Sequence, residues 1–180
     1  MVMLRGLWRL SHFDVAGFAC FTTDARGFWR SFLAALLCLP VWVLAQIEQI
    51  SHLEDAVRLH FILVQSIAYG VAWLAYPLLA LKVSDMFGVW PAYYRYMTAY
   101  NWFRTVLQLI WLPLLLLNLL PGRLSPGLLA LMWLMLQTVE FCYDWFLARR
   151  GLGLAATTAT ALAMIDFLLG LLIDEIGSMV

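Results

Sequence analysis

Three acidic residues lie inside long apolar stretches of this sequence, where an ionised carboxylate is costly. Glu140 and Asp144 fall in the run 127–148, and Asp166 falls in the run 151–173. A charge at the centre of a bilayer costs about 2.5–3.5 kcal/mol on insertion scales, so such a residue faces protein or trapped water. The chemistry that these residues predict is therefore proton transfer or ion pairing.

The spacing of the apolar runs predicts a basic partner and an amide partner at matching depths. Reflection of the sequence through a predicted turn at 121–126 puts Arg104 level with Asp144. The same reflection puts Gln108 level with Glu140. If the two flanking helices are antiparallel neighbours, these side chains lie close together.

A polar stripe on the run 127–148 extends this arrangement. Gln137, Glu140 and Asp144 recur at i, i+3 and i+7 and so share one helical face. Reflection through the next turn, at 149–153, puts Asp166 beside Gln137. The predicted intramembrane polar cluster consists of Arg104, Gln108, Gln137, Glu140, Asp144 and Asp166.

Two explanations of this cluster stay open at the level of the sequence. Polar pairs between neighbouring helices are common structural contacts in membrane bundles. The alternative is a proton or ion path, with Asp166 as its deepest carboxyl and Glu140 as the next step outward. The first predicts that Asp166 is needed for folding, and the second predicts that it is needed for activity.

The composition requires that much of the surface faces lipid. Of the 180 residues, 64% are hydrophobic and 12% are charged, whereas soluble domains have about 45–50% and about 25%. The 11 basic and 11 acidic residues give no cationic surface for nucleic acid. We expect an all-α integral membrane protein whose partners are the lipid bilayer and other membrane helices, in a homo-oligomer or a membrane complex.

Five apolar runs approach the roughly 20 residues that a helix needs to cross a bilayer. The predicted bundle of five transmembrane helices occupies about 31–50, 61–82, 103–121, 127–148 and 152–174, within a membrane domain at 31–176. Residues 1–30 are too charged to span and predict a cytoplasmic, interfacial arm. The aromatic tract 90–104 predicts a second interfacial segment, because Tyr93, Tyr96 and Tyr100 share one helical face.

The distribution of basic residues predicts the orientation. Nine of the 11 Lys and Arg residues fall in the N-terminal arm, in the connections on the same side of the predicted spans or, for Arg104, just inside the span that follows such a connection. The opposite side has Arg58 and Arg123. By the positive-inside rule the N-terminus is cytoplasmic and the C-terminus is on the other side, and the absence of a transit peptide is typical of a cell inner membrane protein.

The sequence contains no motif that predicts an enzyme. We find no G-x-S-x-G, H-E-x-x-H, glycine-rich phosphate loop or C-x-x-C. No catalytic residue, cofactor or metal ligand is predicted. The expected function is a non-enzymatic membrane subunit or scaffold that packs against other membrane proteins or lipids, and the alternative is a small proton-linked transporter or channel.

Overall fold

The computed structural model describes residues 2–51, 53–119 and 125–178, and the regular structure in these ranges is entirely helical. The elements are α1 (Val2–Ser11), the 3-10 helix η1 (Val15–Cys20), α2 (Ala25–Ser31), α3 (Leu33–Ser51), α4 (Asp55–Met86), α5 (Trp90–Leu119), α6 (Pro126–Gly151) and α7 (Ala156–Ser178). The all-α prediction is confirmed.

Four helical stretches in the described part of the chain are long and apolar enough to cross a membrane. They are Ala25–Ser51, in which α2 leads into α3, Val57–Met86 of α4, Pro126–Gly151 of α6 and Ala156–Gly177 of α7. The predicted third span, 103–121, falls in α5, which is not among the four. Asn101, Arg104 and Gln108 interrupt its apolar character, and residues 120–121 lie outside the described residues.

Two helix ends differ from the predicted boundaries for local reasons. The first span begins at Ala25 rather than at residue 31, because the Asp24 side chain accepts a hydrogen bond from the Gly27 amide at 2.9 Å and caps the helix there. The last span begins at Ala156 rather than at residue 152. Gly153 adopts a φ of 71°, a conformation that favours glycine and separates α6 from α7.

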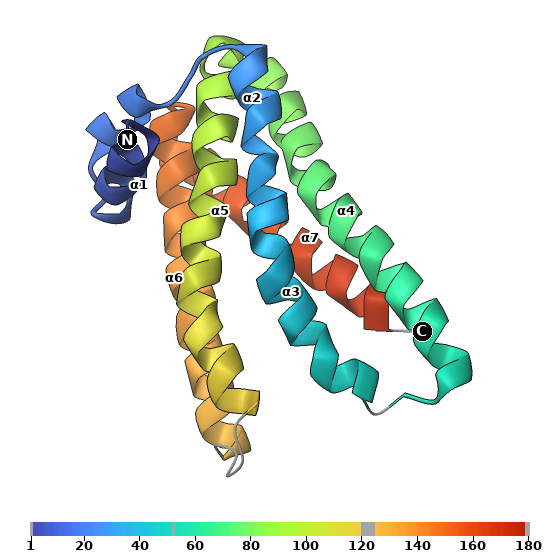
Figure 1. The fold of residues 1–180 in the computed structure, drawn as a ribbon. Coiled ribbons are helices and arrows are strands. Elements are labelled where there is room, and N and C mark those ends of the chain that lie inside the picture. The colour runs from blue at the N-terminus through green and yellow to red at the C-terminus, as the bar shows by residue number, and fades with distance from the viewer. Residues whose placement is uncertain (1, 52, 120–124, 179–180) are drawn as a thin grey trace.

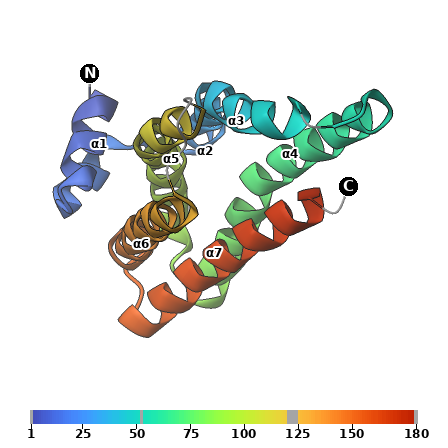
Figure 2. The same cartoon turned by 90° about the horizontal axis from the view of Figure 1, so that it is seen from below.

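Successive long helices run in opposite directions, and α5 and α6 stay side by side along their length (Figure 1). We call the end where α4 and α6 finish and where α5 and α7 begin the closed end. There α5 packs against α2, α4 and α6. Away from it the α3–α4 pair separates from the α5–α6 pair, and α7 packs against both α4 and α6 (Figure 2).

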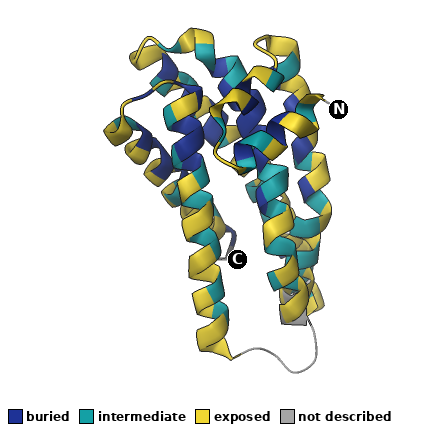
Figure 3. Ribbon diagram, turned by 90° about the vertical axis from the view of Figure 1, so that its left-hand side faces the viewer, coloured by how far each residue is buried: buried dark blue, intermediate teal, exposed yellow. Residues whose placement is uncertain are grey.

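Buried residues gather at the closed end, as the dark blue parts of the ribbon in Figure 3 show. The largest fully buried apolar side chains are Tyr76, Tyr96, Phe103, Leu10, Met97, Leu147 and Leu162, which come from α1, α4, α5, α6 and α7. Tyr93 and Tyr100 are buried as well. The tyrosine face that the sequence assigned to the membrane interface is therefore packed inside the protein.

The N-terminal arm docks against the side of α6. The Tyr143 hydroxyl donates to the Ser11 carbonyl oxygen at 2.6 Å, and the Phe13 ring stacks on the Tyr143 ring with centroids 4.6 Å apart. Asp14 caps η1 by accepting from the Ala16 amide. The Arg9 guanidinium, 2.6 Å from the same carboxylate, and the Ala16 amide lower the pKa of Asp14, so this cap is ionised at neutral pH.

The last residue of α6, Gly151, fits closely into the closed end and provides a test of its packing. A Cβ at this position would lie 2.8 Å from Cδ2 of Tyr96 and 2.9 Å from Cε1 of Phe18, and both rings are buried. We expect Gly151→Ala to lower the free energy of unfolding by about 1–3 kcal/mol through overpacking. Thermal melting in detergent measures this effect, and Gly70→Ala, where a Cβ meets nothing within 4 Å, is the control that keeps the wild-type melting temperature.

Candidate functional site

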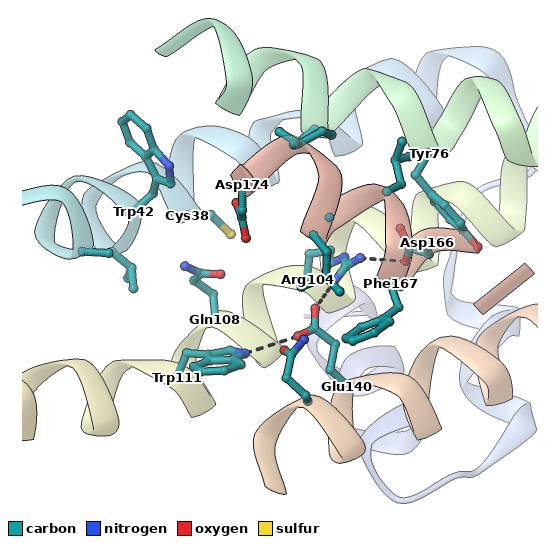
Figure 4. Close-up of a pocket in the computed structure, with 18 of the residues that line it drawn as sticks. Cys38, Trp42, Tyr76, Arg104, Gln108, Trp111, Glu140, Asp166, Phe167 and Asp174 are labelled. Carbon is teal, nitrogen blue, oxygen red and sulfur yellow. Dashed lines mark hydrogen bonds and ion pairs between the residues drawn. The ribbon is translucent and has the colours of Figure 1, made fainter. Parts of the chain in front are cut away.

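A cavity of about 1060 Å³ lies among α3, α4, α5, α6 and α7. All six residues of the polar cluster predicted from the sequence line it, together with side chains from each of the five helices. Tyr76 and Tyr100 line its inner end, where it meets the packed layer of the closed end. Figure 4 shows the polar side chains that converge in this cavity.

Arg104 of α5 is the centre of an ion-pair cluster that connects three helices. Its Nη1 pairs with Oε1 of Glu140 on α6, and its Nη2 lies 2.8 Å from Oδ2 of Asp166 on α7. The same Nη2 lies 3.9 Å from Oδ2 of Asp144. Tyr100, one turn before Arg104, accepts from Nε at 2.9 Å and donates its own hydroxyl to Oδ2 of Asp166 at 2.6 Å.

The cluster has more negative than positive charge. One guanidinium faces three carboxylates, so the four side chains sum to −2 when all are ionised. The side chains of Asp144 and Asp166 are only 6% exposed, and burial makes an unbalanced charge costly. A proton or another cation at this place therefore stabilises the cluster.

Three residues that line the cavity have a buried acceptor atom with no hydrogen-bond partner among the described residues. These atoms are Oε1 of Gln46 on α3 and, at the inner end, Oδ1 of Asp144 and Oδ1 of Asn101. Asn101 uses its amide nitrogen to donate to the Ser31 hydroxyl at 2.8 Å, which leaves the carbonyl oxygen unmatched. Buried polar atoms are almost always paired, so the two oxygens at the inner end mark a place where a donor or a cation fits.

Tyr76 and Tyr100 line the inner end of the cavity, and Tyr96, which is also buried, contacts Tyr76. The hydroxyls of Tyr76 and Tyr96 are hydrogen-bonded to each other, and the Tyr76 ring stacks on the Tyr100 ring with centroids 4.4 Å apart. Through the Tyr100 hydroxyl this aromatic layer is in direct contact with Arg104 and Asp166. The layer closes the cavity on the side of the N-terminal arm.

The contacts within the cluster differ in part from the pairs that the predicted depths gave. Arg104 contacts Asp144, the residue at its predicted depth, but its closer partners are Glu140 and Asp166. Gln108 and Gln137 line the cavity, while the ion pairs of Glu140 and Asp166 are made by Arg104.

Sequence reasoning missed three residues that belong to this site. Tyr100 was assigned to the membrane interface, although its position four residues before Arg104 places both on one helical face. The Trp111 indole donates to Oε2 of Glu140 at 3.4 Å, and its position seven residues after Arg104 is the available signal. Asn101 lies three residues before Arg104, so the same spacing places it on this helical face as well.

The fold and the cavity define a helical protein whose described residues include four helices of membrane-spanning length and apolarity, beside an acidic, aromatic cavity. No protein-family model matches the chain, and neither a curated protein nor a solved structure shows significant similarity to it. In the described residues no group of three or more His, Cys, Asp or Glu side chains is placed to hold a metal ion.

Proposed function

We propose that the chain is a multi-pass protein of the cell inner membrane in which α5 adds a fifth span. This proposal is supported by the packing of α5 against α3, α4 and α6, because a helix that lies alongside three membrane-spanning helices crosses the same bilayer. Its 30 residues extend over about 45 Å at about 1.5 Å per residue, which is enough for a bilayer. The apolar side chains that α1 leaves exposed, Val2, Leu4 and Trp8, suit an interfacial position for the arm.

The proposed orientation places the N-terminus in the cytoplasm and the C-terminus on the opposite side. It is supported by the basic residues Lys82, Arg95, Arg149 and Arg150, which fall near the ends of α4, α5 and α6 that form the closed end, the same end as the arm. The cavity then opens away from the cytoplasm, and the tyrosine layer separates it from the cytoplasmic side.

For the activity we propose a small proton-linked transporter. The observation that carries this proposal is the cavity of about 1060 Å³ with the Arg104 ion-pair cluster at its inner end. A subunit that serves only to pack against other proteins does not need such a space inside its own bundle. The cavity favours the transporter over the scaffold.

The cluster suggests how protons and helix positions are coupled. Protonation of the Asp166 carboxylate weakens its ion pair with Arg104, which is a direct charge contact between α7 and α5. Protonation of Glu140 does the same for the contact between α6 and α5. A proton therefore shifts the balance between conformations that differ in how tightly these helices are held, as coupling between sites requires.

The decisive variant is Asp166→Asn. The amide oxygen still accepts from Arg104 and Tyr100, so we expect a folded protein whose proton flux falls to the rate of empty vesicles. The measurement is the acidification of the interior of proteoliposomes after a proton gradient is imposed, as reported by an enclosed pH-sensitive dye. Asp85→Asn is the matched control, because Asp85 is exposed near the end of α4 and lies outside the cavity.

Two outcomes contradict this mechanism. If Asp166→Asn loses its folded yield while Asp85→Asn does not, the ion pairs act as structural contacts between helices. If flux is unchanged in Glu140→Gln, protons do not pass through this cluster.

The second candidate function is a membrane subunit, and one observation favours it. On α7 the small residues Ala159 and Ala163 are buried inside the bundle, whereas Thr157 and Ala161, four residues apart, are exposed. Small residues at this spacing allow close approach of another helix. Extraction in mild detergent followed by mass spectrometry of the intact complex tests it, since a stoichiometric protein partner supports the subunit and a protein free of partners supports the transporter.

A further inference from the structure

The cavity has an excess of acidic residues from its inner to its outer end. Among the described residues that line it, the acidic ones are Glu140, Asp144, Asp166, Asp174 and Glu175, and the basic one is Arg104. Asp174 lies eight residues, just over two turns, beyond Asp166 on α7 and faces the space across from Gln108 (Figure 4). Walls with one sign of charge attract a solute of the opposite sign.

An independent observation, at the inner end, points to the same kind of ligand. Oδ1 of Asp144 and Oδ1 of Asn101 have no hydrogen-bond partner in the described part of the chain, and these residues are 5% and 1% exposed. Both are acceptors, and both residues line the cavity. A bound group that supplies hydrogen-bond donors or positive charge satisfies them, and an anion does not.

The aromatic lining identifies the cation as organic. Four tryptophans, Trp42, Trp73, Trp111 and Trp133, line the cavity. The Trp111 indole is hydrogen-bonded to Glu140, which holds an aromatic ring next to a carboxylate. Tryptophan is the side chain with the strongest cation–π attraction, and cages of aromatic rings with acidic neighbours recognise ammonium groups.

The size of the cavity excludes a close fit around an inorganic ion. A volume of about 1060 Å³ suits a ligand of drug size, for which cavities are roughly 300–1,000 Å³. Hard metal ions take six or more oxygen ligands at short range. No group of side chains placed to hold a metal occurs among the described residues.

We propose that the cavity binds monovalent organic cations that carry an aromatic or alkyl substituent, such as quaternary ammonium compounds. This inference rests on the proposed transport function, because it names the solute that is exchanged for protons. One cation enters as one proton leaves the carboxylates on the same side of the membrane, so the charge of the site is unchanged. Trp111 and Asp174 hold the ligand, and the Arg104 cluster releases the proton.

The experiment measures binding of two probes with one ring and opposite charge. Phenyltrimethylammonium and benzenesulfonate are titrated by calorimetry into the full chain in lipid nanodiscs. We expect the ammonium probe to bind with release of about one proton, and the sulfonate to give no saturable heat. Asp174→Asn and Trp111→Leu are expected to weaken ammonium binding by about tenfold each.

Matched controls separate the cavity from the surface. Glu54→Gln removes an exposed carboxylate at the start of α4, and Trp8→Leu removes a tryptophan that is exposed on α1, and both should bind like wild type. Equal binding of the two probes, or equal affinities in Asp174→Asn and Glu54→Gln, overturns the inference.

A parallel proteoliposome assay distinguishes the failure of this inference from failure of the proposed function. Proton flux that depends on Asp166, in a protein that does not bind the ammonium probe, leaves the transporter in place and removes the organic cation. If Asp174→Asn and Trp111→Leu weaken ammonium binding but the protein shows no proton flux, the cation site is supported and the transport function is contradicted.

Discussion

Replacement of Arg104 by leucine is expected to destabilise the protein more than any other single change in the cavity. Arg104 is the positive group shared by Glu140, Asp144 and Asp166, and its side chain is 25% exposed. Removal of one member of a buried ion pair costs about 3–5 kcal/mol, because the partner charge stays buried. With three carboxylates affected, we expect the loss to reach this range and the folded yield in detergent to fall sharply.

The size-exclusion profile and the melting temperature of the purified protein measure this loss. Arg150→Leu is the control, since Arg150 is exposed at the end of α6 and its removal changes the net charge equally. Addition of Glu140→Gln and Asp166→Asn to Arg104→Leu should restore much of the stability, because two of the three uncompensated charges, those of the closer partners, are then gone. A single variant that melts like wild type would show that Arg104 does not balance these carboxylates.

The helices and their approximate ends could be predicted because long apolar runs have few alternatives. Four of the predicted spans lie largely within helices of membrane-spanning length and apolarity. The errors at the ends come from single residues whose local effect was not weighed. Asp24 caps a helix that starts six residues before the predicted position, and Gly153 delays the start of α7.

The site was partly accessible because depth in an antiparallel hairpin follows from counting residues. Counting places Arg104 level with Asp144 and Gln108 level with Glu140, and the structure brings Arg104, Glu140 and Asp144 into one cluster with Asp166. Counting gives depth but not the direction in which a side chain points. The long Arg104 side chain reaches two helices at once, which no pairwise reflection describes.

The tyrosines show where the sequence pattern misleads. A face of Tyr93, Tyr96 and Tyr100 next to charged residues is typical of a membrane interface, and it is equally suited to a buried layer whose hydroxyls find partners. In the structure Tyr93 donates to the carbonyl of Pro77 at 3.0 Å, and Tyr100 donates to Asp166. Only the packing of α5 among its neighbours decides between the two.

The packed layer at the closed end makes the second large prediction. Phe103 is fully buried next to Arg104, and the centroid of its ring lies 4.9 Å from the centroid of the Tyr143 ring on α6. We expect Phe103→Ala to lower the free energy of unfolding by about 3–5 kcal/mol, because a buried aromatic ring is lost and the rigid neighbours cannot collapse into the space. Thermal melting in detergent measures the change.

A matched control separates the loss of packing from the loss of a phenylalanine as such. Phe87, just beyond the end of α4, is 48% exposed, and Phe87→Ala should melt like wild type. Phe103→Leu keeps most of the apolar volume and should recover more than half of the lost stability. If Phe103→Ala and Phe87→Ala have the same melting temperature, the closed end is not a packed core and cannot seal the inner end of the cavity.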